Sequence, residues 1–394
     1  METTLKSLDT VIKASLIGFV LFSMFSISVS QISLGLGGLA WFVKLQLTRS
    51  WKEQFWPIGI PVLFYVVACL LAVAFAVDPD YSYKSLKKLL QILIFFWVLN
   101  NVRDEKHRDF LITLLIISGC VAASYGFYQF LVTELTEKSR VAGTMSIYMT
   151  FAGILMLVGL LASGRFVFRR PREKWVAGAV GLILFCLLLT LTRQAWLGFF
   201  AGSLFLVTLW RVRFLLAVPI IAVMVYFLSP SAVQSRIHSM VNLNDWTLQA
   251  RLALWKGGWN VFKDYPVTGC GFRCMDLVHP DYPDPTGYIE KYRGLHNNFV
   301  QIAVDTGILG LISWMSIWAA YFWQIFRRYF QAGENDSLRW VVTGSGAAVV
   351  GFLAGGMFEV NFYDSEVAML LFFIMALPFC GQKQKPDLVN GTNG

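Results

Sequence analysis

Apolar positions fill most of the chain in long runs, and short polar or basic segments separate these runs. Each run approaches the roughly 20 residues that an α-helix needs to cross a bilayer. The pattern predicts about twelve such helices, at approximately residues 14–30, 31–47, 57–77, 86–100, 109–132, 145–164, 175–192, 194–210, 212–229, 297–326, 338–360 and 365–381. We therefore expect an all-α polytopic membrane protein.

The runs divide the chain into four parts. Residues 1–229 form a nine-helix membrane region, and residues 297–381 form three further membrane helices. Between them, residues 230–296 form one long loop, with interfacial helices and enough length to build a site. Residues 382–394 form a polar tail.

The distribution of positive charge predicts the orientation of these helices. With the N-terminus in the cytoplasm, 20 of the 33 Lys and Arg residues fall in the N-terminal segment, in alternate loops or in the tail. That is the side on which membrane proteins carry their excess of Lys and Arg. Both termini are then cytoplasmic, and the loop 230–296 lies on the outer side.

Composition excludes several other classes of protein. An apolar content of 56% with 14% charged residues does not suit a soluble globule. The net charge of +9 does not indicate a nucleic-acid partner, because most cations lie in short interhelical loops. The chain has no HExxH motif and no paired CxxC motif, so we expect no metal and no cofactor. Cys270 and Cys274 lie in the long loop, and the sequence leaves open whether they form a disulfide.

The remaining 13 Lys and Arg residues lie on the outer face, where an anionic ligand would explain them. Arg193 stands between two apolar runs, a costly place unless the side chain is paired or functional. It either extends to the lipid headgroups or grips a phosphate with its two-pronged guanidinium, and we favour the phosphate. Further cations near predicted helix ends on this face, which anionic lipid or solvent can also explain, are Lys84, Lys88, Arg140 and Arg293.

The segment from Arg251 to Phe262 has helical periodicity, with Trp255 and Trp259 in its apolar stripe. Such a helix lies in the membrane interface with its aromatic rings at headgroup level. Arg251, at the edge of the stripe, would point along the membrane surface towards a lipid-borne diphosphate. The alternative is a packing helix whose Arg is solvated.

His296 lies where the long loop re-enters the membrane, at the predicted start of a helix. A single His is often structural, but a neutral imidazole beside several outer cations can act as a general base. We favour the catalytic interpretation.

These short motifs, in this order, resemble those of the O-antigen ligases of Gram-negative bacteria. The superfamily also includes O-antigen polymerases and protein O-oligosaccharyltransferases. The motifs are Arg140-Val-Ala-Gly-Thr, Thr192-Arg193-Gln-Ala-Trp196-Leu-Gly, Arg251 with Trp255, His296-Asn-Asn-Phe and Asp305-Thr-Gly307. In the second motif, Gln194 stands where the family often has glycine.

The resemblance implies a GT-C-like multi-spanning glycosyltransferase of the bacterial inner membrane, with its active site in the periplasm. Such an enzyme transfers a glycan from undecaprenyl diphosphate to a sugar hydroxyl of lipid A–core, with inversion and without metal or nucleotide. The implied partners are this donor, the lipid A–core acceptor and membrane lipids. The alternatives are a polymerase or an O-oligosaccharyltransferase of the same superfamily, and a transporter or flippase is a more distant one.

For this reaction, the positions of the residues predict their single roles. His296 would be the general base, with Arg193 and Arg251 as the other catalytic residues. Binding of the diphosphate would fall to Lys84, Lys88, Arg140, Arg193, Arg251 and Arg293. Lipid or sugar contacts would come from Trp196, Trp255 and Trp259.

Overall fold

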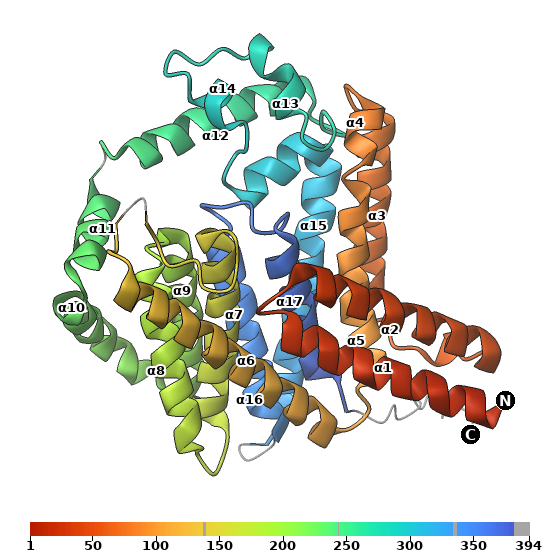
Figure 1. The fold of residues 1–394 in the computed structure, drawn as a ribbon. Coiled ribbons are helices and arrows are strands. Elements are labelled where there is room, and N and C mark those ends of the chain that lie inside the picture. Colours follow the sequence, from red (N-terminus) through yellow and green to blue (C-terminus); the bar gives the residue numbers. More distant parts are fainter. Residues whose placement is uncertain (137–138, 243, 334–336, 382–394) are drawn as a thin grey trace, which may run out of the picture.

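The computed structural model of the chain describes residues 1–136, 139–242, 244–333 and 337–381. Within these ranges every regular element is helical. The predicted cytoplasmic tail, 382–394, lies outside the described residues. Figure 1 shows the helices as one bundle, with α12, α13 and α14 gathered at one end.

The elements follow the predicted order. The N-terminal ones are α1 (Glu2–Phe22), α2 (Ile27–Thr48), η1 (Trp51–Glu53), α3 (Gly59–Ala74), α4 (Pro79–Tyr83), η2 (Leu86–Ile92), α5 (Leu93–Asn101) and α6 (Glu105–Val132). They are followed by α7 (Tyr148–Phe168), α8 (Lys174–Leu189), α9 (Arg193–Arg211), η3 (Val212–Ala217) and α10 (Val218–Leu228). The long loop holds α11 (Ser231–Val241), α12 (Trp246–Asp264), α13 (Met275–Val278), η4 (His279–Asp281) and α14 (Tyr288–Tyr292). The chain then forms α15 (Asn298–Gln331), α16 (Ser337–Gly355), α17 (Ser365–Ala376) and η5 (Leu377–Phe379).

Several of these helices are long and apolar enough to cross a membrane. Among the described residues, five helices meet this description by length and composition: Glu105–Val132, Tyr148–Phe168, Arg193–Leu228, Asn298–Gln331 and Ser337–Gly355. Three apolar helices are shorter, Gly59–Ala74, Lys174–Leu189 and Ser365–Phe379. The protein is therefore a helical polytopic membrane protein.

The predicted boundaries of the first helix were wrong. The sequence placed it at 14–30, whereas α1 begins at Glu2 and ends at Phe22. Glu2 and Lys6 lie one turn apart and form an ion pair of 2.7 Å, so the polar start continues as helix. The turn that follows ends at Ser26, whose side chain accepts a hydrogen bond from the Val29 N–H and so begins α2.

Close contacts between glycines hold the centre of the bundle together. Helix α16 packs against both α7 and α9. A Cβ on Gly164 of α7 would lie 2.4 Å from the Cα of Gly344, and one on Gly198 of α9 would lie 2.5 Å from the carbonyl oxygen of Gly351. Small residues let membrane helices approach closely, and here they let α16 sit between its two neighbours.

Helix α15 is kinked at Gly307, which has φ 64° and ψ −166°. A Cβ on this glycine would lie 2.2 Å from the carbonyl oxygen of Val267. The long loop reaches α15 here, because the N–H groups of Cys270 and Gly271 donate to the carbonyl oxygens of Val304 and Asp305, at 3.0 and 3.1 Å. The kink therefore forms the seam between the bundle and the loop.

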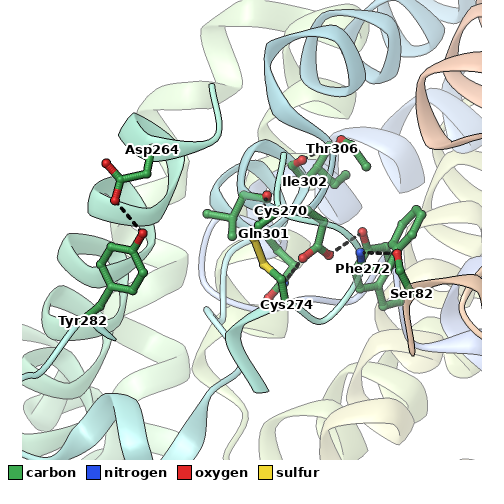
Figure 2. The surroundings of a disulfide bond; sticks show 12 residues. Ser82, Asp264, Cys270, Phe272, Cys274, Tyr282, Gln301, Ile302 and Thr306 are labelled. Carbon is green, nitrogen blue, oxygen red and sulfur yellow. Dashed lines mark hydrogen bonds between the residues drawn. A yellow bond between two sulfur atoms is a disulfide. The ribbon is translucent and has the colours of Figure 1, made fainter. Parts of the chain in front are cut away.

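Cys270 and Cys274 form a disulfide, with their Cα atoms 5.7 Å apart. Figure 2 shows this bond beside the first turns of α15 and the hydrogen bond of 2.8 Å from the Phe272 N–H to Ser82 Oγ. The loop also has a small apolar core of its own, which includes Leu254, Val261 and Met275. The loop is thus a folded cap tied both to α4 and to α15.

Candidate functional site

A cavity of about 580 Å³ lies between this cap and the end of the bundle. Segments far apart in the sequence form its walls: the start of α2, η2, the start of α7, the cap and the connection between α16 and α17. Its polar side chains include Lys88, Thr150, Arg273, Asp276, Tyr292, Arg293, His296, Glu359, Asp364 and Glu366. The cavity thus combines cations, carboxylates and one imidazole.

His296 occupies the turn just before α15 and has a positive φ of 46°. The side chain of the next residue, Asn297, caps the helix by accepting from the N–H groups of Phe299 and Val300. The Nδ1 atom of His296 lies 3.1 and 3.3 Å from the two carboxylate oxygens of Glu359. The imidazole is therefore held by a residue from the other side of the cavity.

Asn298 brings these two residues together. Its backbone N–H donates to the carbonyl oxygen of Gly356 at 2.7 Å, and its side-chain oxygen accepts from the Phe362 N–H at 3.1 Å. Asn298 is completely buried. The start of α15 and the connection that carries Glu359 are consequently fixed to each other by the backbone and side chain of Asn298.

The environment of Glu359 favours its charged form. Burial acts to raise the pKa of this carboxyl, but the hydrogen bond with His296, the Val360 N–H and the charge of Arg251 outweigh burial, and the pKa is lowered. A carboxylate can only accept hydrogen bonds, so the Nδ1 atom of His296 carries a hydrogen and donates it. The opposite ring nitrogen, Nε2, is then the atom available to take a proton from a ligand.

Arg251 supports this pair from α12. Its Nε atom donates to the carbonyl oxygen of Phe358, the neighbour of Glu359, at 3.2 Å. Burial lowers the pKa of Arg251, and the charge of Glu359 opposes that shift. One turn further along α12, the Trp255 Nε1–H donates to the carbonyl oxygen of Leu295, the neighbour of His296, at 2.9 Å. Helix α12 therefore braces both halves of the His296–Glu359 pair.

Arg193, at the first position of α9, pairs with groups of the protein. Its guanidinium forms a salt bridge of 3.1 Å with Asp245 and donates to the side chain and carbonyl oxygen of Ser239 and to Thr247. Burial acts to raise the pKa of Asp245, but the hydrogen bonds from Thr247 and Arg193 outweigh it and lower the pKa. Arg193 thus joins α9 to the start of α12, outside the lining of the cavity.

The structure brings some of the other predicted cations to the cavity and not others. Lys88 and Arg293 line it, and the Lys88 ammonium donates to the carbonyl oxygen of Tyr363 at 2.8 Å. Lys84 lies over the ring of Tyr81, and Arg140 over the ring of Tyr148, and neither is part of the lining.

The three predicted tryptophans have separate surroundings. Trp255 forms the hydrogen bond to the carbonyl oxygen of Leu295 described above. Trp196 faces an apolar groove between α8, α9 and α10, and its Nε1–H donates to the carbonyl oxygen of Leu187 at 3.0 Å. Trp259 is 59% exposed and stacks on Phe262.

Sequence reasoning missed the acidic half of the site. Glu359, Asp364 and Glu366 fall within eight residues between the last two apolar runs, and this cluster was a usable signal. Arg273 was not singled out either. It lies between the two disulfide cysteines in the sequence, lines the cavity and pairs with Asp276 at 2.7 Å. Within the ranges that the structure describes, no group of three or more His, Cys, Asp or Glu side chains is arranged to hold a metal ion.

A bundle of apolar helices with a charged cavity under a folded cap defines a polytopic membrane protein with a candidate site at one end of the bundle. Residues 178–315 match the family model described as O-antigen ligase. This match covers a segment that runs from α8 to the middle of α15, and it supports membership of the O-antigen ligase family. That segment contains Arg193, Arg251 and His296 and ends before Glu359. No curated protein matches the chain significantly.

Proposed function

We propose that the protein is a glycosyltransferase that moves a glycan from undecaprenyl diphosphate to a sugar hydroxyl of lipid A–core in lipopolysaccharide biosynthesis. The observation that carries the proposal is the His296–Glu359 pair at the wall of a cavity that also holds Lys88, Arg273 and Arg293. A base and a group of cations are what the transfer of a sugar from a diphosphate requires.

In the proposed reaction, the acceptor hydroxyl gives its proton to Nε2 of His296. The acceptor oxygen attacks the anomeric carbon from the face opposite the diphosphate and forms the new glycosidic bond. The bond between the anomeric carbon and the diphosphate oxygen breaks, and undecaprenyl diphosphate leaves with that electron pair. Glu359 holds Nδ1–H and balances the positive charge that forms on the imidazole.

The cations of the cavity stabilise the leaving diphosphate. Lys88, Arg273 and Arg293 can contact it directly, because they line the same cavity as His296. Arg251 and Arg193 act further back: Arg251 holds the connection that carries Glu359, and Arg193 holds the start of α12. Lys84 and Arg140 add positive charge on the same outer face.

The same proposal includes the topology. Twelve helices cross the inner membrane in a GT-C-like arrangement, both termini are cytoplasmic, and the cap 230–296 faces the periplasm. Five long apolar helices, three shorter ones and the placement of basic residues in alternate loops support this topology. The cavity then lies at the outer membrane surface, where two lipid-anchored substrates can meet. Trp196 and Trp259 lie on apolar surfaces suited to lipid contact.

The test is transfer by the purified protein from an undecaprenyl diphosphate-linked glycan to lipid A–core. We expect wild-type protein and His238→Ala to form product and His296→Ala to lose activity by roughly 10²- to 10⁴-fold. His238 is the matched control because it lies in α11 and hydrogen-bonds to Tyr226, outside the cavity. Equal activity of the two variants would remove His296 from its role. Transfer only to a second lipid-linked glycan would identify a polymerase, and transfer only to protein Ser or Thr an oligosaccharyltransferase.

A further inference from the structure

A second, apolar groove of about 650 Å³ runs along α2. One of its walls is a stripe on α2 that begins at Gln31 and ends at Leu45. The other wall comes from η2 and α5, with Leu90, Leu93 and Trp97. The groove is lined mainly by apolar side chains and has two ammonium groups, those of Lys87 and Lys88.

The groove adjoins the cavity that holds His296. Lys88 and Ser365 line both spaces. Gln91 lies at the same junction, where its amide donates to the hydroxyl of Ser365 at 2.7 Å. Ile27, the first residue of α2, lines the cavity, and the stripe that begins four residues later lines the groove. One face of α2 therefore leads from the polar cavity into the apolar groove.

The length of this face is close to the thickness of the hydrocarbon core of a bilayer. From Ile27 to Leu45 an α-helix rises about 27 Å, close to the roughly 30 Å of the hydrocarbon core. The side chains at its open edge are exposed: Leu39 by 63% and Leu90 by 60%. A surface of this kind is open to the lipid phase and can receive a long apolar chain along its length.

Two glycines of α2 keep the groove open. A Cβ built on Gly35 or on Gly38 would meet no atom within 4 Å. Gly37 differs, because a Cβ there would lie 2.3 Å from the ring of Trp97 and 2.7 Å from Ser15. Gly37 is thus needed for helix packing, whereas Gly35 and Gly38 leave space that the protein itself does not fill.

We propose that this groove binds the polyprenyl chain of the donor, with the diphosphate beside Lys87 and Lys88 and the sugar in the cavity next to His296. The inference rests on the proposed function and adds the place of the lipid chain. Cations at the cavity end suit an anionic head, and one narrow groove suits a single chain better than the several acyl chains of lipid A. The apolar groove between α8, α9 and α10 is similar in size, about 600 Å³, but none of the described residues lines both it and the cavity.

The test fills the groove from a position that tolerates a side chain. Gly38→Phe places a ring in the open space, and Gly181→Phe on α8 is the matched control, because a Cβ there also meets no atom within 4 Å and Gly181 lines neither space. The KM is measured for two donors with the same diphosphate-linked glycan, one on undecaprenol and one on a ten-carbon isoprenol.

We expect Gly38→Phe to raise the KM for the undecaprenyl donor by about tenfold, the loss expected when about two methylene groups leave apolar contact. The KM for the ten-carbon donor should stay within twofold of the control, because a ten-carbon chain is far shorter than the groove. If Gly38→Phe matched Gly181→Phe with the undecaprenyl donor, or impaired both donors equally, the groove would not hold the chain.

Failure of the proposed function gives a different result. A wild-type protein inactive with both donors would overturn the transferase proposal and leave the groove to be judged by binding. Equilibrium binding of undecaprenyl diphosphate to the full-length protein in detergent then decides. Weaker binding by Gly38→Phe than by Gly181→Phe supports the groove, and equal binding overturns it.

Discussion

The imidazole Nδ1 of His296 lies 3.1 Å from Oε1 of Glu359, a residue 63 positions further along the chain. The two side chains come from opposite ends of an intervening pair of long helices, and the buried Asn298 ties their backbones together. Because the carboxylate accepts a hydrogen bond from Nδ1–H, the opposite ring nitrogen, Nε2, carries no hydrogen and can accept one.

Replacing Glu359 by Gln should lower kcat on the order of 10²-fold with a smaller change in KM. The amide keeps the size of the side chain but removes the charge that balances the protonated imidazole. Steady-state kinetics with both substrates measure this change. Glu290→Gln, on an exposed position of α14, is the matched control and should behave as wild type. An unchanged kcat in Glu359→Gln would show that the pair has no catalytic role.

The same variant makes a prediction about pH and stability. The pKa of Glu359 is lowered in the folded protein, so its charged form stabilises the fold above the unfolded value of about 4.3, and this contribution is lost as the pH falls through the lowered value. The difference in unfolding free energy between wild type and Glu359→Gln should therefore shrink as the pH falls from about 5 through the lowered pKa of Glu359. Thermal unfolding in detergent at several pH values measures it. A difference that grows on acidification would contradict the assignment.

Arg193 and Asp245 should be energetically coupled. Their side chains are 11% and 9% exposed, and removal of one partner leaves a poorly solvated charge, which costs about 3–5 kcal/mol in buried pairs. A double-mutant cycle with Arg193→Ala and Asp245→Ala should give a coupling free energy of about 1–3 kcal/mol in unfolding. Additive effects of the two substitutions would mean that the salt bridge does not hold α9 to α12.

The disulfide between Cys270 and Cys274 should matter more for activity than for stability. The bond closes a very short loop, so it restricts the conformations of the unfolded chain little. In the folded protein it fixes the backbone around Arg273, which lines the cavity. The double variant Cys270→Ser/Cys274→Ser should raise the KM for the donor by several-fold and leave the unfolding temperature within a few degrees. Cys120→Ser, which changes a free cysteine on α6, is the control. A large loss of unfolding temperature with an unchanged KM would reverse this assignment.

Gly307→Ala should destabilise the protein by at least about 2 kcal/mol, because the position needs a positive φ and the new Cβ would press on the backbone of Val267. Gly178→Ala is the matched substitution in open space and should change stability by less than about 1 kcal/mol. Unfolding in detergent compares the two. If both variants were equally stable, the kink of α15 would not depend on this glycine.

The sequence by itself determined the helical class and the approximate places of the helices, because every long apolar run must satisfy its backbone hydrogen bonds within a helix in lipid. It also pointed to His296, Lys88 and Arg293, which line the cavity, since cations and an imidazole at predicted helix ends are unusual enough to be noticed. The limits of α1 were missed because a polar first turn carries no apolar signal.

Only the tertiary structure decided which of these residues share a site. The pairing of His296 with Glu359, the engagement of Arg193 by Asp245 and the meeting of groove and cavity at Lys88 all join segments far apart along the chain. Such contacts depend on how closely helices approach, which small residues such as Gly344 and Gly351 set through packing. Hydrophobic periodicity indicates which face of a helix is apolar, but it does not indicate which neighbouring helix that face contacts.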